Sequence, residues 1–112
     1  MRLIFILILG FFLVPDLKAQ PAYCQLSGAV FVEKDPAKVQ YRVFLEPSES
    51  FADMLVFQAS NALFADKPGN WFFTDARAQA NIFIMFVKER SQADFSIHYT
   101  ETESFAGCQS LR

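Results

Sequence analysis

The stretch Phe51-Ala52-Asp53 returns thirteen residues later as Phe64-Ala65-Asp66 and comes back near the end of the chain as Phe105-Ala106-Gly107. Weaker copies, Gln79-Ala80-Asn81 and Gln92-Ala93-Asp94, stand between them, and the last residues of successive copies are 13, 15, 13 and 13 residues apart. An internal period of this kind decides the architecture before any local preference does. The sequence therefore predicts a chain built from one short unit used repeatedly.

Alignment on the last residue of each copy, which we call the marker, divides residues 28–107 into six units of 13 to 15 residues. The position ten residues before the marker is always apolar: Val30, Val43, Val56, Trp71, Ile84 and Ile97. The next position, which points to the opposite face of a strand, holds Phe31, Phe44, Phe57, Phe72, Met85 and His98. Each unit thus predicts a five- or six-residue strand followed by a polar turn segment. Because both faces are largely apolar, either the turns wrap over the second face or a partner covers it.

The marker position holds Gln40, Asp53, Asp66, Asn81, Asp94 and Gly107. Asp, Asn and Gly favour turns, and the first two accept hydrogen bonds from nearby backbone N–H groups. We therefore interpret Asp53, Asp66, Asn81, Asp94 and Gly107 as a structural, turn-closing repeat. The preceding position is Ala in five of the six units, which predicts close chain crossings. Lys67-Pro68-Gly69-Asn70 carries the two-residue insertion of unit four and is a strong turn signal. The predicted fold is all-β, with six short strands in 13–15-residue repeats forming a compact single domain, which is self-wrapped if the turns cover the second face.

Residues 1–19 have the pattern of a signal peptide. A short basic start, Met1-Arg2, precedes the apolar run Leu3 to Val14, and Ala19 offers a cleavage point before Gln20. We expect an exported protein, periplasmic or secreted, whose mature part is residues 20–112 with a repeat core at 28–108 and no attachment to the membrane after cleavage. Loss of Arg2, Lys18 and Asp16 leaves 8 basic and 11 acidic residues, a net charge of −3. Without a basic stripe, nucleic acid is not an expected partner.

Cys24 and Cys108 are the only two cysteines, at opposite ends of the mature chain. In an oxidising compartment they predict a disulfide, with a free or intermolecular thiol as the alternative. A closed loop of about 85 residues would stabilise the fold by about 4 to 5 kcal/mol.

The strand-then-marker repeat resembles the septoil-knot domain family of small bacterial proteins. The resemblance is carried by Val30-Phe31-Val32 and by the repeated marker segments, and it extends from about Gly28 to Cys108. It implies a chain tied in a seven-crossing torus knot, in which repeated winding would cover both strand faces. It implies no established activity.

Catalysis, metal and cofactor chemistry find little support in the residues. His98 is the best acid–base candidate, with Glu101 and Glu103 close in sequence, and a small hydrolase using His98 is the weakest alternative. His98 stands, however, where other units have Phe or Met. Asp53, Asp66 and Asp94 supply one carboxylate per unit, unlike the clustered oxygens of a calcium loop. We expect no catalytic residue, no metal site and no cofactor.

Binding is the leading expectation. The sequence predicts an exported structural or binding domain that is a monomer. It does not indicate the partner. The alternative is a carbohydrate- or peptide-binding module using exposed aromatics, for which Tyr23, Tyr41, Trp71 and Tyr99 are the candidates because such amphipathic rings line recognition surfaces. Most of the Phe residues are expected in the core.

Overall fold

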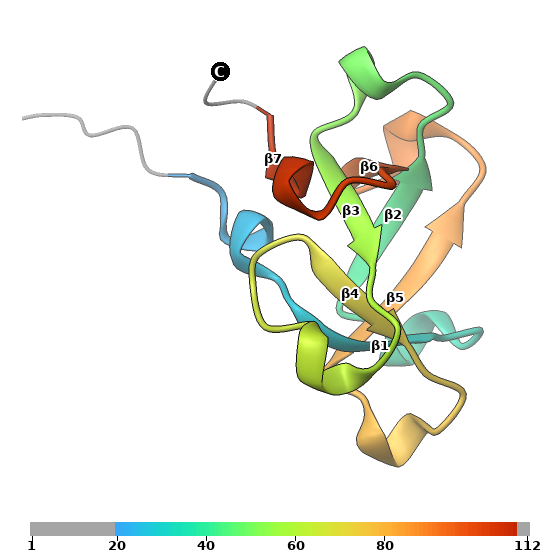
Figure 1. Ribbon diagram of the computed structural model, residues 1–112. Helices are drawn as coiled ribbons and strands as arrows, with labels where there is room; N and C mark the ends of the chain where they lie inside the picture. The colour runs from blue at the N-terminus through green and yellow to red at the C-terminus, as the bar shows by residue number, and fades with distance from the viewer. Residues whose placement is uncertain (1–19, 110–112) are drawn as a thin grey trace, which may run out of the picture.

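The computed structural model describes residues 20–109 (Figure 1), so the predicted signal peptide lies outside the described residues. Every predicted unit contains one strand, and a short seventh strand begins at the last marker. The strands are β1 (Gly28–Val32), β2 (Tyr41–Leu45), β3 (Met54–Gln58), β4 (Asn70–Phe73), β5 (Ile82–Val87), β6 (Phe95–Tyr99) and β7 (Gly107–Cys108). The predicted all-β repeat fold is confirmed, and only β7 was not expected.

Each connection contains one turn of 3₁₀ helix. These turns are η1 (Ala22–Gln25), η2 (Pro36–Lys38), η3 (Glu49–Phe51), η4 (Ala62–Phe64), η5 (Arg77–Gln79), η6 (Arg90–Gln92) and η7 (Glu103–Phe105), of which η1 precedes the first strand. In η3 to η7 the alanine before the marker closes the turn, because its N–H donates to the carbonyl three residues earlier. Ala52 and Ala65 are buried, at 6% and 5% exposure, as the predicted close crossings require.

Six of the strands form a closed parallel barrel. The order around it is β4-β1-β5-β2-β6-β3, and β3 pairs with β4 to close the ring. Short connections suffice because eight residues, such as 33–40, can span up to about 26 to 29 Å, whereas a five-residue strand is only about 17 Å long. Each connection can therefore run back outside the barrel to the start of the next strand.

The chain passes twice around this barrel. Strands β1, β2 and β3 occupy alternate places on the first passage, and β5 and β6 fill the gaps between them on the second. Strand β4 lies directly beside β3, and the Lys67–Asn70 insertion is in the connection that makes this shorter step. The short β7 then pairs antiparallel with the first half of β3. The order of the strands thus confirms a self-wrapped domain.

The barrel interior is filled by the strand position ten residues before each marker. All six of these side chains, Val30, Val43, Val56, Trp71, Ile84 and Ile97, are fully buried. Two residues later the same face reaches the end of the barrel, where Val32 and Leu45 are 41% and 44% exposed. The outer face is half-buried, and connections cover part of it: the Arg77 guanidinium lies 5.7 Å from the centre of the Phe31 ring, and that of Arg90 lies 5.6 Å from Phe44.

Ion pairs to two buried carboxylates hold these half-exposed arginines in place. Arg77 pairs with Glu33, and Arg90 pairs with Glu46. Glu33 and Glu46 are each 7% exposed, and at the start of its own connection Glu33 accepts two backbone N–H groups and Glu46 accepts one. The repeat therefore covers two outward phenylalanines with cations from units three places further along the chain.

The predicted disulfide is present. Cys24 and Cys108 are bonded, with their Cα atoms 5.4 Å apart and a sequence separation of 84 residues. The bond fastens η1 to β7, and so joins the start of the domain to the strand that ends it.

Candidate functional site

Four of the marker side chains hydrogen-bond to the strand that lies next to their own in the barrel. The Asp53 carboxylate accepts the Ser96 N–H at 2.9 Å, and Asp94 accepts the Arg42 N–H at 2.7 Å. Gln40 and Asn81 make the equivalent bonds to the N–H groups of Phe83 and Ala29. In all four cases the marker's own N–H donates to the carbonyl of the same partner residue. These partners are 43 or 52 residues away, whereas the sequence suggested bonds within the local turn.

Two markers differ from this pattern. Asp66 is separated from β4 by the insertion, and its exposed side chain has no hydrogen-bond or ion-pair partner within residues 20–109. Gly107 begins β7 with φ +119°, a backbone conformation that only glycine adopts without strain. Gln40 makes the marker bond although the turn prediction did not include it.

His98 lies on β6 and is half-buried. Its Nδ1 is 2.9 Å from the backbone carbonyl of Glu46, so the neutral ring carries its proton on Nδ1 and donates it there. Of the two carboxylates near it in sequence, Glu103 is instead hydrogen-bonded to Asn70. His98 is thus fixed to the outside of the barrel by a neighbouring connection.

The aromatic residues predicted to line a recognition surface point inward. Trp71 is fully buried and donates its indole N–H to the Leu26 carbonyl, and the Tyr23 ring stacks on Phe95 at 4.3 Å between centres. Tyr99 packs against the core, where burial raises the pKa of its phenol. The assignment of Trp71 to a binding surface was therefore wrong.

The exposed aromatic residues are phenylalanines of the 3₁₀ turns. Phe51, Phe64 and Phe105 are 67%, 58% and 53% exposed, and Leu63 beside Phe64 is 83% exposed. Each Phe stands two residues before a marker, where the other three units have Lys38, Gln79 and Gln92. The expectation that most Phe residues are buried does not hold for these three. The sequence signal was present, because this position of the turn holds Phe in three units and a polar residue in the other three.

The three phenylalanine turns lie around β3, and we call Phe51, Leu63, Phe64 and Phe105 the β3-side surface. Turn η3 leads into β3, η4 follows it, and η7 leads into β7, which pairs with β3 (Figure 1). The Gln109 side chain joins the end of β7 to η3 by donating to the Glu49 and Ala52 carbonyls. Turns η5 and η6, which carry the paired arginines, flank β5. Arg90 of η6 also donates to the Phe51 carbonyl of η3 at 3.4 Å, so η6 borders the β3-side surface.

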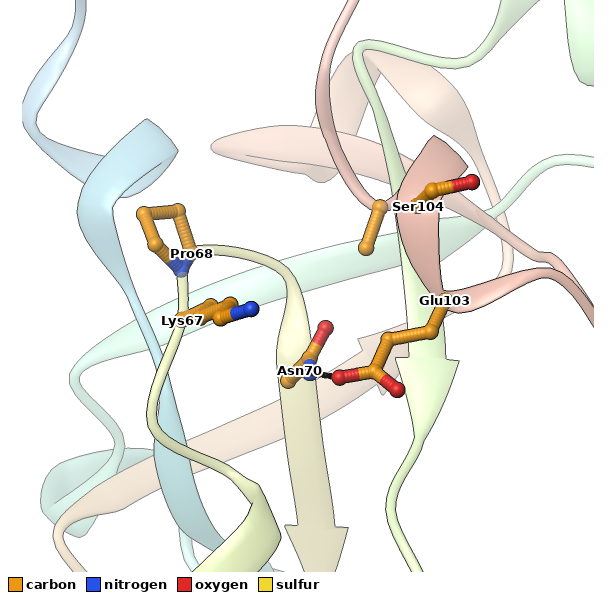
Figure 2. Close-up of a pocket in the computed structure, with 6 residues that line it drawn as sticks. Lys67, Pro68, Asn70, Glu103 and Ser104 are labelled. Carbon is orange, nitrogen blue, oxygen red and sulfur yellow. Dashed lines mark hydrogen bonds between the residues drawn. The ribbon is translucent and has the colours of Figure 1, made fainter.

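A groove separates two of the phenylalanine turns. It lies between the Lys67–Asn70 loop and η7, has a volume of about 620 Å³, and is lined by Lys67, Pro68, Asn70, Glu103, Ser104 and Ala106 (Figure 2). Asn70, only 1% exposed, donates its side-chain N–H to Glu103 at 2.8 Å and to the Phe64 carbonyl at 3.4 Å. Its amide thus joins η4 to η7 across the base of the groove.

Two further observations concern the described residues alone. Between residues 20 and 109, no helix is long and apolar enough to cross a membrane. The same residues contain no group of three His, Cys, Asp or Glu side chains placed to hold a metal ion.

The fold and its cross-strand markers define a class of small, doubly wound parallel β-barrels built from one repeated unit. A model of the 7(1) septoil knot domain matches residues 23–109, and the chain belongs to that family. The predicted resemblance is confirmed over nearly the whole described region. No curated protein and no solved structure is significantly similar to the chain.

Proposed function

We propose that this protein is an exported, disulfide-bonded domain that acts by binding rather than catalysis, through its β3-side surface. The apolar leader at residues 3–14 supports export, and the Cys24–Cys108 bond is the chemistry of an oxidising compartment. The partner is then a component of the cell envelope or of the surroundings of the cell.

The observation that carries this proposal is the exposure of Phe51, Phe64 and Phe105 on turns around one strand. Lys38, Gln79 and Gln92 show that the same position of the unit accepts polar residues. Aromatic side chains are enriched at contact surfaces, and large exposed apolar side chains around one strand are therefore candidates for one.

The hydrogen bonds and ion pairs of the candidate acid–base groups also favour binding over catalysis. His98 donates to a backbone carbonyl, and Glu33 and Glu46 each combine an ion pair with a turn cap. These side chains hold connections against the barrel, which gives a rigid support for the turns that carry phenylalanine.

Export is tested by the intact mass of the protein recovered from outside the cytoplasm. A chain beginning at Gln20 that takes up no alkylating group before reduction, and two after it, is expected. A recovered chain that retains residues 1–19, or that alkylates without reduction, would contradict the exported disulfide form.

Binding is tested by retention of the purified domain on a cell-envelope fraction of the producing cells. Phe51→Ser/Phe64→Ser/Phe105→Ser should abolish retention, because it removes the exposed rings and leaves the core intact. Lys38→Ser/Gln79→Ser/Gln92→Ser changes the same position of the other three units and should be retained like the unaltered domain. Equal retention of both triple variants would reject the proposed surface.

A further inference from the structure

The groove beside η7 exists because unit four departs from the repeat. Gly69, with φ +88°, lies so close to the end of the η7 segment that a Cβ atom there would be 2.4 Å from the Gly107 nitrogen. The Gly69 N–H donates to the Leu26 carbonyl at 3.0 Å, which also accepts the Trp71 indole N–H at 3.1 Å. The inserted loop is therefore anchored at its base, and the groove is a built feature of the fold.

Asn70 leaves one strong acceptor directed into this groove. Both hydrogen bonds of its side chain use the amide nitrogen, and residues 20–109 offer no donor to Oδ1. In Figure 2 this oxygen points away from Glu103, into the space between the loop and η7. Although the residue is only 1% exposed, this oxygen still reaches solvent, so water can donate to it and a ligand hydroxyl can take the place of that water.

The other polar groups of the groove complete a mixed set of donors and acceptors. The Lys67 ammonium is a donor, the Glu103 carboxylate an acceptor, and the Ser104 hydroxyl can be either. An anionic ligand would face Glu103 and the lone pairs of Asn70 Oδ1, and a cationic ligand would face Lys67. Neutral ligand groups that both donate and accept hydrogen bonds match all four polar side chains of the groove.

Hydroxyl groups fit this set better than a peptide backbone. Extended peptides are commonly bound along a free strand edge, whereas β4 is already paired with both β1 and β3. The groove groups converge from a loop and a turn, as vicinal hydroxyls would require. Apolar Pro68 and Ala106 also line it, and Phe64 and Phe105 stand on the adjoining turns. These apolar groups can pack on the C–H faces of a sugar ring.

We propose that this groove is a carbohydrate-binding site, in which Asn70 Oδ1 and Glu103 accept from neighbouring sugar hydroxyls while Lys67 donates to one. The inference rests on the binding function proposed above and names its ligand class.

The test is an NMR titration of the ¹⁵N-labelled, disulfide-bonded domain with short neutral oligosaccharides of glucose, mannose and N-acetylglucosamine, each added separately. An uncharged alanine–glycine peptide is the comparison. At least one oligosaccharide should shift the Asn70 side-chain amide and the backbone amides of Asn70, Ser104 and Ala106, and the peptide should not.

Variants of exposed groove residues separate binding from folding. Glu103→Ala and Lys67→Ala should each weaken oligosaccharide binding about tenfold or more, the usual effect of losing a hydrogen bond to a charged group. Glu101→Ala removes an exposed carboxylate outside the groove lining and should bind unchanged. Ser104→Trp, which fills the groove from an exposed position, should abolish binding while the amide spectrum remains that of the folded domain.

Shifts caused only by the peptide, or no shift with any of the oligosaccharides, would overturn the carbohydrate assignment. If envelope retention still depended on the three phenylalanines, that result would reject the groove ligand and keep the wider binding surface. If no oligosaccharide shifts the spectrum and envelope retention does not depend on the phenylalanines, both the carbohydrate site and the β3-side binding surface are rejected.

Discussion

Asp53 and Ser96 are joined by a reciprocal pair of hydrogen bonds between two strands that are 43 residues apart in sequence. The Asp53 N–H donates to the Ser96 carbonyl at 3.1 Å, and the Ser96 N–H donates to the Asp53 carboxylate at 2.9 Å. The side chain thus substitutes for the backbone carbonyl that would extend the β3–β6 ladder. Strands from the first and second passages of the chain are held in register by this bond.

Replacing Asp53 with Ala should lower the free energy of unfolding by about 1 to 3 kcal/mol, because it leaves the N–H of the buried Ser96 without its acceptor. Asp53→Asn keeps an acceptor oxygen and should retain most of the stability. Asp66→Ala is the matched control and should change it by less than about 0.5 kcal/mol, since the Asp66 side chain is exposed and unbonded within residues 20–109. Urea unfolding measures all three, and equal losses for Asp53→Ala and Asp66→Ala would contradict the cross-strand role.

Ala65→Leu should destabilise the domain by about 1 to 3 kcal/mol, because the 5% exposed alanine leaves no room for a larger side chain. Ala62→Leu, in the exposed first position of the same turn, provides the comparison and should be nearly neutral. The urea midpoints of the two variants measure this difference in stability. A neutral Ala65→Leu would show that the chain does not cross closely there.

Removing the disulfide with Cys24→Ala/Cys108→Ala should lower stability by about 4 to 5 kcal/mol in the chain-entropy model for a loop of this size. Thermal unfolding with and without a reducing agent should place the reduced protein near the double variant. A reduced protein as stable as the oxidised one would show that η1 and β7 stay in place without the bond.

Arg90→Met should cost about 1 to 3 kcal/mol, because it leaves the buried Glu46 carboxylate without its cation while water still reaches the half-exposed site. Lys88→Met, in the same connection but exposed and unpaired in the described region, should be close to neutral. Adding Glu46→Gln to Arg90→Met should recover part of the loss by removing the unpaired charge. No recovery in the urea midpoint would indicate that packing on Phe44, rather than charge, dominates.

Stability should fall at alkaline pH partly through Tyr99. Burial raises the pKa of its phenol above the ordinary value of 10.0, so the folded state keeps the proton that the unfolded state loses. The contribution is complete below pH 10 and is lost as the pH rises through the folded-state pKa. Tyr99→Phe should flatten this part of the stability profile measured by urea unfolding, and an unchanged profile would assign the loss to other groups.

The repeat was visible in the sequence because one strand-and-turn unit must meet the same packing demands each time it is used. The buried position that includes Val30 and Ile84 therefore kept its apolar character in all six units. The strand order was not visible. The strand order depends on which distant units become neighbours, and so do the β3–β4 closure and the partner of each marker. A pattern of nearby residues does not determine which distant units pair.

The site was harder to anticipate than the fold. Hydrophobicity alone favoured burial for Phe51, Phe64 and Phe105, and amphipathic character favoured exposure for Trp71, yet the structure has the reverse. The better guide was position within the unit: Trp71 stands at the invariant apolar position, whereas the three phenylalanines stand where other units are polar. Asn70 gave no signal, because its role depends on Glu103, 33 residues away.

Hydrogen–deuterium exchange of the domain, free and bound to the envelope fraction that retains it, tests the binding account most directly. Binding through the β3-side surface predicts slower exchange in the segments that contain η3, η4 and η7 and unchanged exchange in those that contain η2 and η5. Protection confined to η2 and η5 would contradict it.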